Sequence, residues 1–265
     1  MKSKKPIVIR AKKSLGQNFL KNKSVVLDIV QAANLNSEDT VLEIGPGKGV
    51  LTGELLKIAK KVIAVEKDDM LFEYLLEKFA HEIENEKLVL IHGDILEENT
   101  DLPKDYKLVA NIPYNITGEI IKMFLTAKKQ PSLIVLLVQY EVAERIIVKD
   151  GKESILSISV KVYGEPKLVK KVMKENFSPQ PRVDSAILLI ENISKDFFKG
   201  ISEKDFFILV KAGFSQKRKK LSNTLKSILR DNLDKTFKRA NISPDLRAEK
   251  LNISDWKKLL QSETS

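Results

Sequence analysis

The first half of the chain contains apolar runs, each followed by a polar or glycine-rich break. The runs are nearly continuous and rich in Val, Ile and Leu, which is typical of strands covered on both faces. The stretches between them place apolar residues on one helical face, as Leu51, Leu55 and Leu56 do. Strands that alternate with helices predict a parallel sheet with helices on both sides. The predicted strands are 40–45, 61–66, 87–94, 107–114 and 133–140, and the predicted helices are 51–59, 69–79 and 118–127.

The pattern changes after residue 140. Segments 141–148 and 153–162 have helical spacing, whereas 168–177 and 183–190 look like two strands separated by a segment with two prolines. Two such strands after a parallel sheet predict a mixed α/β sheet with an antiparallel edge strand. From about residue 195 the pattern is helical and basic. We therefore expect a flexible basic arm over 1–12, an α/β domain over 13–192 and a small α-helical domain over 193–265.

Composition narrows the classes of protein that fit. The 265 residues are 43% hydrophobic and 31% charged, as in a globular chain. There is no cysteine and only two histidines, His81 and His92, so we expect neither disulfides nor a metal site. No apolar run approaches a membrane span, and no apolar segment with a cleavage site follows the basic N-terminus. We expect a cytoplasmic monomer without a membrane partner.

The net charge of +10 is concentrated at the two ends of the chain. Residues 1–24 hold eight Lys and Arg and no acidic residue, and residues 195–265 hold seventeen against nine, so each end carries +8 and the middle −6. Attraction to a polyanion such as nucleic acid explains this distribution, although on charge alone lysine-rich solubility is the simpler explanation. The densest basic segment, 215–226, carries Lys217, Arg218, Lys219 and Lys220. On a helix, some of these four would contact phosphate and others would only be solvated.

A glycine-rich turn follows the first predicted strand. The segment LEIGPGKGVLT places Gly45, Gly47 and Gly49 between that strand and a helix. Glycines there let the backbone turn tightly and approach a ligand, at the nucleotide-binding position of an open α/β sheet. Glu66 ends the next strand, 21 residues after Gly45, where a carboxylate can accept both ribose hydroxyls, and Asp94 ends the third. Together these features favour a nucleoside cofactor over a plain turn with helix caps.

The acidic residue before the first glycine helps to choose that cofactor. The pattern from Glu43 is E-x-G-x-G-x-G, whereas the dinucleotide fingerprint is G-x-G-x-x-G/A. It resembles the S-adenosylmethionine (SAM) motif of class I methyltransferases, which implies a Rossmann-like methyltransferase sheet. SAM has no pyrophosphate but carries a sulfonium and an amino-acid tail, which acidic and amide groups suit better than an anion-binding turn. NAD remains the alternative on the glycines alone.

The run VANIPYNIT ends a predicted strand with an amide, a proline and an aromatic ring: Asn111, Pro113 and Tyr114. This turn matches the Asn/Asp-Pro-Pro-Tyr/Phe motif of amino-methyltransferases, with Ile at the second position. An adenine amine is a poor nucleophile because its lone pair is delocalised into the ring. An amide side chain and a backbone carbonyl can accept its hydrogens and favour the pyramidal nitrogen of the transition state. The proline stiffens the turn and the ring offers a stacking face, although the segment alone also fits an ordinary turn.

Six motifs occur in order along the chain and together resemble one family. They are KSLGQNFL (13–20), LEIGPGKGVLT (42–52), AVEKD (64–68), GDIL (93–96), NIPYNIT (111–117) and NFSPQPRVDSAI (176–187). They are similar to the motifs of ribosomal RNA adenine dimethyltransferases, over roughly 13–230. Those enzymes use SAM to convert two adjacent adenosines near the 3′ end of small-subunit rRNA to N6,N6-dimethyladenosine. Erythromycin-resistance methylases of 23S rRNA and mitochondrial transcription factor B proteins look alike and remain alternatives, as do a DNA adenine methylase and a nucleic-acid-binding assembly factor.

The resemblance implies a set of residues around the cofactor. Asn18 and Leu20 would lie over the cofactor, and Gly45 and Gly47 would approach its methionine part. Glu66 would bind the ribose and Asp94 the adenine amine. Asn111 would lie between the cofactor and the substrate amine. The implied cofactor-binding residues are Asn18, Leu20, Gly45, Gly47, Glu66, Asp94 and Asn111.

The resemblance also implies residues for the substrate. Asn111, Pro113, Tyr114 and Phe177 are the implied catalytic residues, with Phe177 clamping the target base opposite Tyr114. Without the family pattern, Phe177 fits a core aromatic at the end of a strand. The helical domain would bind small-subunit rRNA, either free or in an assembling subunit, through the basic segment that contains Lys217.

Overall fold

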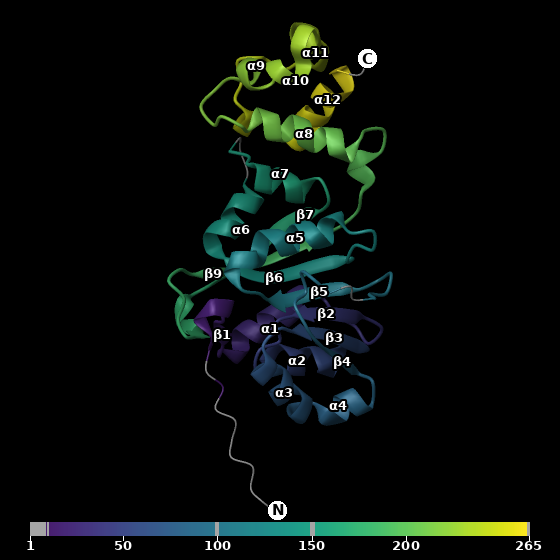
Figure 1. The fold of residues 1–265 in the computed structure, drawn as a ribbon, viewed down its shortest axis with the longest axis vertical. Helices are drawn as coiled ribbons and strands as arrows, with labels where there is room; N and C mark the ends of the chain where they lie inside the picture. The colour runs from purple at the N-terminus through teal and green to yellow at the C-terminus, as the bar shows by residue number, and fades with distance from the viewer. Residues whose placement is uncertain (1–8, 10, 99–100, 149–151, 264–265) are drawn as a thin grey trace, which may run out of the picture. The chain divides into compact units, whose positions relative to one another are not determined.

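The computed structural model of the chain describes residues 9, 11–98, 101–148 and 152–263 (Figure 1). Backbone contacts divide the chain into two compact units: one comprises residues up to Ala143 with Lys167–Ile193, and the other comprises Glu144–Pro166 with the residues from Ser194 onward. In this division Glu144–Pro166, which lie within the predicted α/β domain, belong to the second unit, and the domain bounds 13–192 and 193–265 stay a prediction. Of the predicted arm 1–12, residues 1–8 and 10 lie outside the described residues, so its flexibility stays a prediction.

The first unit carries a seven-stranded sheet with the order β4-β3-β2-β5-β6-β9-β7. Its first five strands run parallel to one another. Each ends just before a polar or glycine-rich break, as the pattern of apolar runs predicted. Their bounds are β2 Thr40–Ile44, β3 Lys61–Glu66, β4 Leu88–His92, β5 Lys107–Asn111 and β6 Leu133–Gln139. The predicted α/β sheet is confirmed.

The predicted antiparallel edge is also confirmed, and two strands form it. β9 (Ser185–Glu191) runs antiparallel to β6, and β7 (Glu165–Val172) lies outside β9. The side chains explain which strand is outermost. β9 has the sequence SAILLIE and is buried at most positions, whereas β7 has the sequence EPKLVKKV and is largely exposed. Lysines along an outer strand discourage pairing with another chain, so β7 suits the edge.

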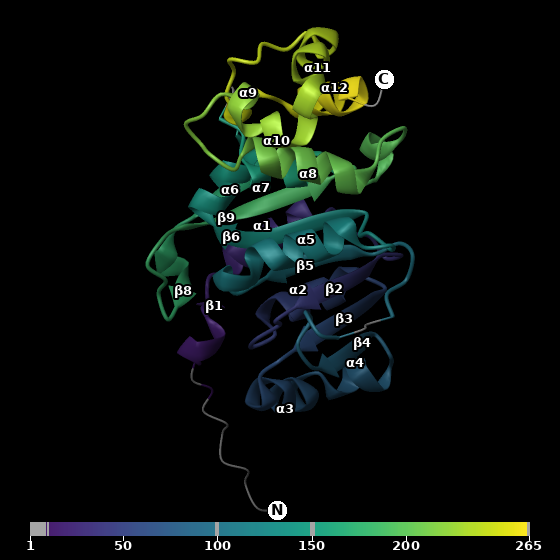
Figure 2. The ribbon, with the colours of Figure 1, turned by 45° about the horizontal axis from the view of Figure 1, so that its top comes forward.

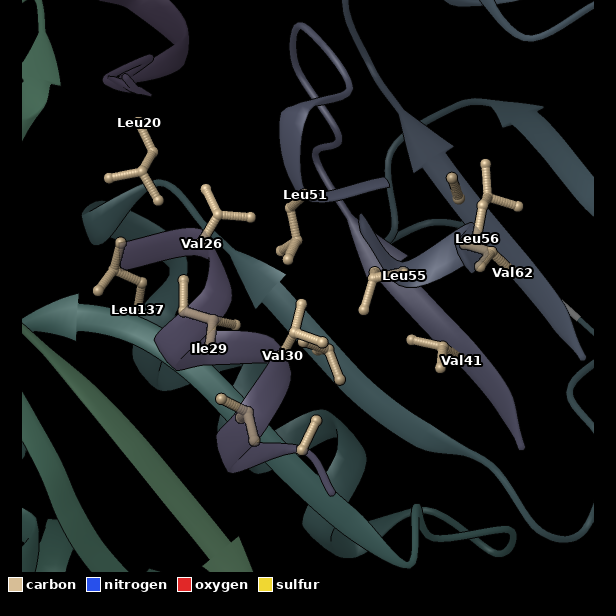
Figure 3. Packing of buried hydrophobic residues seen from close by; sticks show 14 of the residues in the cluster. Leu20, Val26, Ile29, Val30, Val41, Leu51, Leu55, Leu56, Val62 and Leu137 are labelled. Atoms are coloured by element: carbon tan, nitrogen blue, oxygen red, sulfur yellow. The ribbon is translucent and has the colours of Figure 1, made fainter. Parts of the chain in front are cut away.

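Two helices pack with the strands in one apolar cluster (Figure 3). These are α1 (Lys23–Ala32) and α2 (Val50–Ile58). Ile29 of α1, Leu55 of α2 and Leu137 of β6 have no exposed surface and belong to this cluster. This buried cluster stabilises β2 and α2, which flank the glycine turn. Truncating Ile29 to Ala would destabilise the fold by about 2–5 kcal/mol.

The remaining helices of the first unit begin at the ends of strands. α3 (Asp69–Lys78) starts after Asp68, whose carboxylate accepts hydrogen bonds from two backbone amides of the first turn. It is followed by α4 (Ala80–Glu84), and α5 (Thr117–Thr126) follows β5. The predicted helices at 51–59, 69–79 and 118–127 are confirmed as α2, α3 and α5.

From Ser194 onward the described residues of the second unit contain helices and no strand, as predicted (Figure 2). Contacts of Tyr163, just after α7 (Ile155–Lys161), help to explain why Glu144–Pro166 belong to the second unit. The Tyr163 hydroxyl donates to Glu203 Oε1 at 2.7 Å, and its ring lies 5.3 Å from that of Phe198. No helix within the described ranges is long and apolar enough to cross a membrane. The helices are α7 Ile155–Lys161, α8 Glu203–Gly213, α9 Leu221–Thr224, α10 Lys226–Leu229, α11 Leu233–Ala240 and α12 Ile253–Glu263, and α6, Tyr140–Ile147, crosses the boundary between the units.

Candidate active site

A cavity of about 220 Å³ opens at the carboxyl ends of β2, β3 and β5. β2 lies where the strand order reverses, because β3 and β4 follow on one side of it and β5 and β6 on the other. A crevice forms at such a point in open α/β sheets, and ligands bind there. Nine of the predicted site residues line the cavity: Asn18, Leu20, Gly45, Gly47, Glu66, Asp94, Asn111, Pro113 and Tyr114.

The glycine turn forms one wall of the cavity, and its three glycines differ in what they permit. All three have left-handed backbones, with φ of +64°, +59° and +68° at Gly45, Gly47 and Gly49. A Cβ at Gly49 would clash with the Phe79 ring and lie 2.8 Å from Leu75 Cδ2, so packing requires glycine there. A Cβ at Gly45 would meet no atom within 4 Å. The space beside Gly45 is therefore open to a ligand.

Glu66 connects the glycine turn to the end of β3. Its Oε2 accepts the Gly47 amide at 3.0 Å, and its Oε1 accepts the Asp68 amide at 2.9 Å. The side chain is buried, and this burial raises its pKa. A carboxylate offers about four acceptor positions, more than these two amides use, so it can accept further donors. This arrangement suits the predicted contact with two ribose hydroxyls.

Asp94 is shared between the cavity and a lysine. Its Oδ2 lies 2.5 Å from Lys67 Nζ, and its Oδ1 accepts the Leu96 amide at 3.1 Å. The hydrogen bond from Lys67 lowers the pKa of Asp94, which keeps the carboxylate charged and able to accept an amine hydrogen. Lys67 also lines the cavity and was not among the predicted residues.

Glu43 lines the cavity as well, although it was not among the predicted site residues. Its side chain is 1% exposed, and its Oε2 accepts no hydrogen bond from any residue that the structure describes. Burial raises the pKa of Glu43 to about 8, with Glu66 adding to the effect and Thr52 opposing it. A buried acceptor without a donor is costly unless a ligand satisfies it. The signal in the sequence was its place before the first glycine of the turn.

The turn after β5 lies on the opposite side of the cavity from β3. Asn111 ends the strand, and its Nδ2 lies 3.4 Å from the backbone oxygen of Asn18. The Tyr114 hydroxyl lies 2.7 Å from Ser185 Oγ at the start of β9, which holds the ring in place. Phe19 also lines the cavity and packs beside Gly47, where a Cβ would lie 3.3 Å from its ring. It was missed although it lies between the two predicted residues of its motif.

Phe177 is the one predicted catalytic residue that does not line the cavity. It forms β8 (Phe177–Ser178), which pairs antiparallel with β1 (Phe19–Leu20), so that Phe177 lies opposite Leu20. Its side chain is 2% exposed and packs in the apolar cluster of α1 and α2. A stacking role opposite Tyr114 requires the ring to leave this cluster, so that role stays a prediction.

The four basic residues Lys217–Lys220 belong to the second unit and lie in the loop between α8 and α9. The expectation that they lie on a helix was wrong, because α8 ends at Gly213, which packs closely against Trp256. All four are exposed, and Lys220 Nζ lies 2.8 Å from Asp245 Oδ1. Three of the four charges form no ion pair with residues in the described ranges, which leaves them available to an anionic partner.

The cavity suits a cationic nucleoside better than a dinucleotide. Glu66, and Glu43 once it has lost its proton, would repel a pyrophosphate but stabilise a sulfonium or an ammonium group. The open space beside Gly45 leaves room for an amino-acid tail. These residues fit SAM and weaken the NAD alternative. Among the residues that the structure describes, no group of three or more His, Asp or Glu could hold a metal ion.

Comparison with known proteins agrees with this geometry. The model of the family "Ribosomal RNA adenine dimethylase" matches residues 8–264. The "Ribosomal RNA small subunit methyltransferase A" of Dehalococcoides mccartyi is 45% identical over 258 residues, covering 95% of this chain and 88% of its own. A dimethyladenosine transferase from Plasmodium falciparum has a TM-score of 0.78 at 29% identity, over 92% of this chain and 96% of its own. The 23S rRNA methyltransferase ErmE has a TM-score of 0.77 at 25% identity, over 94% and 100%.

Proposed function

Because the chain belongs to the ribosomal RNA adenine dimethylase family, we propose that it dimethylates the N6 amines of two adjacent adenosines near the 3′ end of small-subunit rRNA. The methyl donor is SAM, and the product is S-adenosylhomocysteine. The enzyme acts in the cytoplasm as a monomer, on rRNA within an assembling small subunit. The observation that carries the proposal is the position of Asn111 on the wall of a cavity whose other wall holds two buried carboxylates.

The cofactor-binding residues divide by the part of SAM that each would contact. Glu43 and the turn at Gly45 and Gly47 would hold the amino-acid tail, Glu66 the ribose hydroxyls and Asp94 the adenine amine. Asn18 and Leu20 would cover the cofactor from the other side. When bound, SAM would supply an electrophilic methyl group to the substrate amine.

Asn111 and the turn after it would prepare the substrate amine. The Asn111 side-chain oxygen and a backbone carbonyl of the turn accept the two amine hydrogens, which favours the pyramidal nitrogen. Tyr114, held by Ser185, offers its ring face to an extruded adenine. Positioning the amine in line with the methyl group is the main contribution of the site, since the amine proton can leave after transfer. A pocket that holds the base by its faces accepts a monomethylated amine for the second transfer.

A large-subunit substrate is the second candidate, since the 23S rRNA methyltransferase ErmE has the same fold. The relative named for the small subunit is more similar, at 45% against 25% identity, and this favours the small subunit. The choice is tested with labelled SAM on immature small subunits and on protein-free 23S rRNA, followed by mapping of the modified nucleotides. Label on two adjacent adenosines of the small subunit supports the proposal.

One variant, compared with the wild type, makes this test specific. Asn111→Ala should bind SAM yet lose at least about a hundredfold in methyl transfer, since one acceptor of the amine is lost. Wild-type protein that binds SAM but incorporates no label would instead favour an assembly factor without catalysis. Asn111→Ala with an unchanged rate would remove the proposed activation of the amine.

A further inference from the structure

Residues 12–18, which we name the strap, cross one side of the cofactor cavity just before β1. At its C-terminal end the chain is held by backbone pairing, because β1 pairs with β8 and the Lys21 amide donates to Asn176 O at 2.9 Å. The strap lies at the purple end of the ribbon, beside the label β1 in Figure 2. Its residues that line the cavity are Ser14, Leu15, Gly16, Gln17 and Asn18.

The strap is also held by the side chains of Lys12 and Gln17, near its two ends, which meet on one carboxylate oxygen. Asp68 Oδ2 accepts Gln17 Nε2 at 3.1 Å and lies 2.9 Å from Lys12 Nζ. Gln17 Oε1 in turn accepts the Lys12 amide at 2.8 Å. The Asp68 side chain is 2% exposed, whereas that of Lys12 is 41% exposed, so the contact through Gln17 is the more protected from solvent. Although burial opposes it, hydrogen bonds from Lys12 and Gln17 lower the pKa of Asp68 and keep it charged.

The middle of the strap touches the substrate side of the cavity. Gly16 has φ of +64°, and a Cβ there would lie 3.1 Å from Asn115 Oδ1 and 3.4 Å from Pro113 Cβ. The backbone oxygen of Asn18 lies 3.4 Å from Asn111 Nδ2. The strap therefore contacts both Asp68 and the turn at Asn111 and Pro113, which would hold the substrate amine.

Asp68 also contacts Glu66, the predicted ribose-binding residue. The Asp68 amide donates to Glu66 Oε1 at 2.9 Å, and its Oδ1 accepts the Met70 and Leu71 amides that begin α3. One aspartate thus fixes the strap to a rigid helix start and to the carboxylate that faces the ribose. Because five residues of the strap line the cavity, freeing the strap from Asp68 would open that side of the cavity.

We propose that Gln17 and Asp68 are positioning residues that hold the strap closed over the bound cofactor and so set how fast the cofactor dissociates. The proposal rests on the proposed function only for the identity of that cofactor. The β1–β8 pair serves as the hinge, since its backbone hydrogen bonds do not involve Asp68. Opening at the Asp68 end exposes the cavity without disturbing the core.

The experiment measures dissociation of S-adenosylhomocysteine by stopped-flow fluorescence in the full-length protein. Gln17→Glu places a second carboxylate against Asp68 and should raise the dissociation rate at least about tenfold, the effect of losing one hydrogen bond to a charged group. The KM for SAM should rise with kcat almost unchanged. Amide exchange of residues 13–18 should become faster, and a merely structural role would not confine the change to that segment.

A second variant keeps the test independent of folding. Gln17→Glu combined with Asp68→Asn restores a donor and an acceptor with their direction reversed, and the amide oxygen at 68 can still cap α3. Dissociation should return to within about threefold of wild type, because the same single hydrogen bond is regained. Gln31→Glu, the same change at an exposed position of α1, is the matched control and should leave dissociation unchanged.

Three results would overturn the proposal, and they are distinguishable. Equal dissociation rates in the wild type and Gln17→Glu, with tight binding in both, would reject the strap while leaving the proposed function intact. A double variant that dissociates as fast as Gln17→Glu would show that the hydrogen bond itself is not what holds the strap. A wild-type protein that binds neither SAM nor S-adenosylhomocysteine would reject the cofactor assignment and the strap with it.

Discussion

Replacing Glu43 with Gln should make the protein more stable in alkaline solution. In the fold, burial raises the pKa of Glu43 to about 8 from an ordinary value of 4.5, so the folded chain binds a proton more tightly than the unfolded chain. The stability that this proton provides is complete below about pH 4.5 and is lost as pH rises through 8. The difference in pKa corresponds to about 5 kcal/mol of unfolding free energy at most. Gln keeps the shape of the side chain and does not ionise.

The assay is urea unfolding of the wild type and Glu43→Gln at pH 5 and pH 9. The free-energy difference between the two proteins should move in favour of the variant by several kcal/mol between these pH values. A matched substitution, Glu38→Gln, changes an exposed carboxylate and should show no such pH dependence. A free-energy difference for Glu43→Gln that is the same at both pH values would refute the reasoning.

A cationic ligand should reverse the protonation of Glu43. If the SAM ammonium or sulfonium satisfies this buried carboxylate, binding near pH 7 releases close to one proton from it. Calorimetry of SAM binding in two buffers with different ionisation enthalpies gives the proton count, and Glu43→Gln should release about one proton fewer. The same count in both proteins would place the cation elsewhere.

Three further changes separate folding from binding. Gly49→Ala should lower the unfolding free energy by about 2–5 kcal/mol in urea titrations, because a left-handed backbone and a clash with Phe79 add together. Gly45→Ala should lower it by only about 1–2 kcal/mol yet weaken SAM binding at least about tenfold in calorimetry, since its Cβ enters open cavity; a larger loss of stability than in Gly49→Ala would contradict this. Replacing all four residues Lys217–Lys220 with Gln should reduce the slope of log affinity for rRNA against log salt by about 3, and an unchanged slope would remove this loop from the RNA-binding surface.

The sequence predicted the sheet well because its strands and helices depend on local patterns. Each strand from β2 to β6 is an apolar run closed by a polar or glycine residue, and amphipathic helices follow β2, β3 and β5. The pairing of β1 with β8 could not be predicted, because Leu20 and Phe177 are 157 positions apart and each strand has two residues. The grouping of Glu144–Pro166 with the second unit depends in the same way on distant contacts, such as that of Tyr163 with Glu203.

For the candidate site, spacing along the chain predicted the residues that end strands. Glu66, Asp94 and Asn111 meet because parallel strands end at one edge of a sheet. Burial, by contrast, cannot be read from one motif: Glu43 is an orphaned acid and Phe177 a core ring only because of what packs around them. Lys67 and Gln17 were missed since their partners, Asp94 and Asp68, are set by the tertiary fold.

The central claim is tested most directly by mapping N6,N6-dimethyladenosine in rRNA from cells with and without this protein. The account predicts that two adjacent adenosines near the 3′ end of small-subunit rRNA lose the modification when the protein is absent. The wild-type protein should restore both, and Asn111→Ala should restore neither. Dimethyladenosines that persist without the protein, or a loss confined to large-subunit rRNA, would contradict the account.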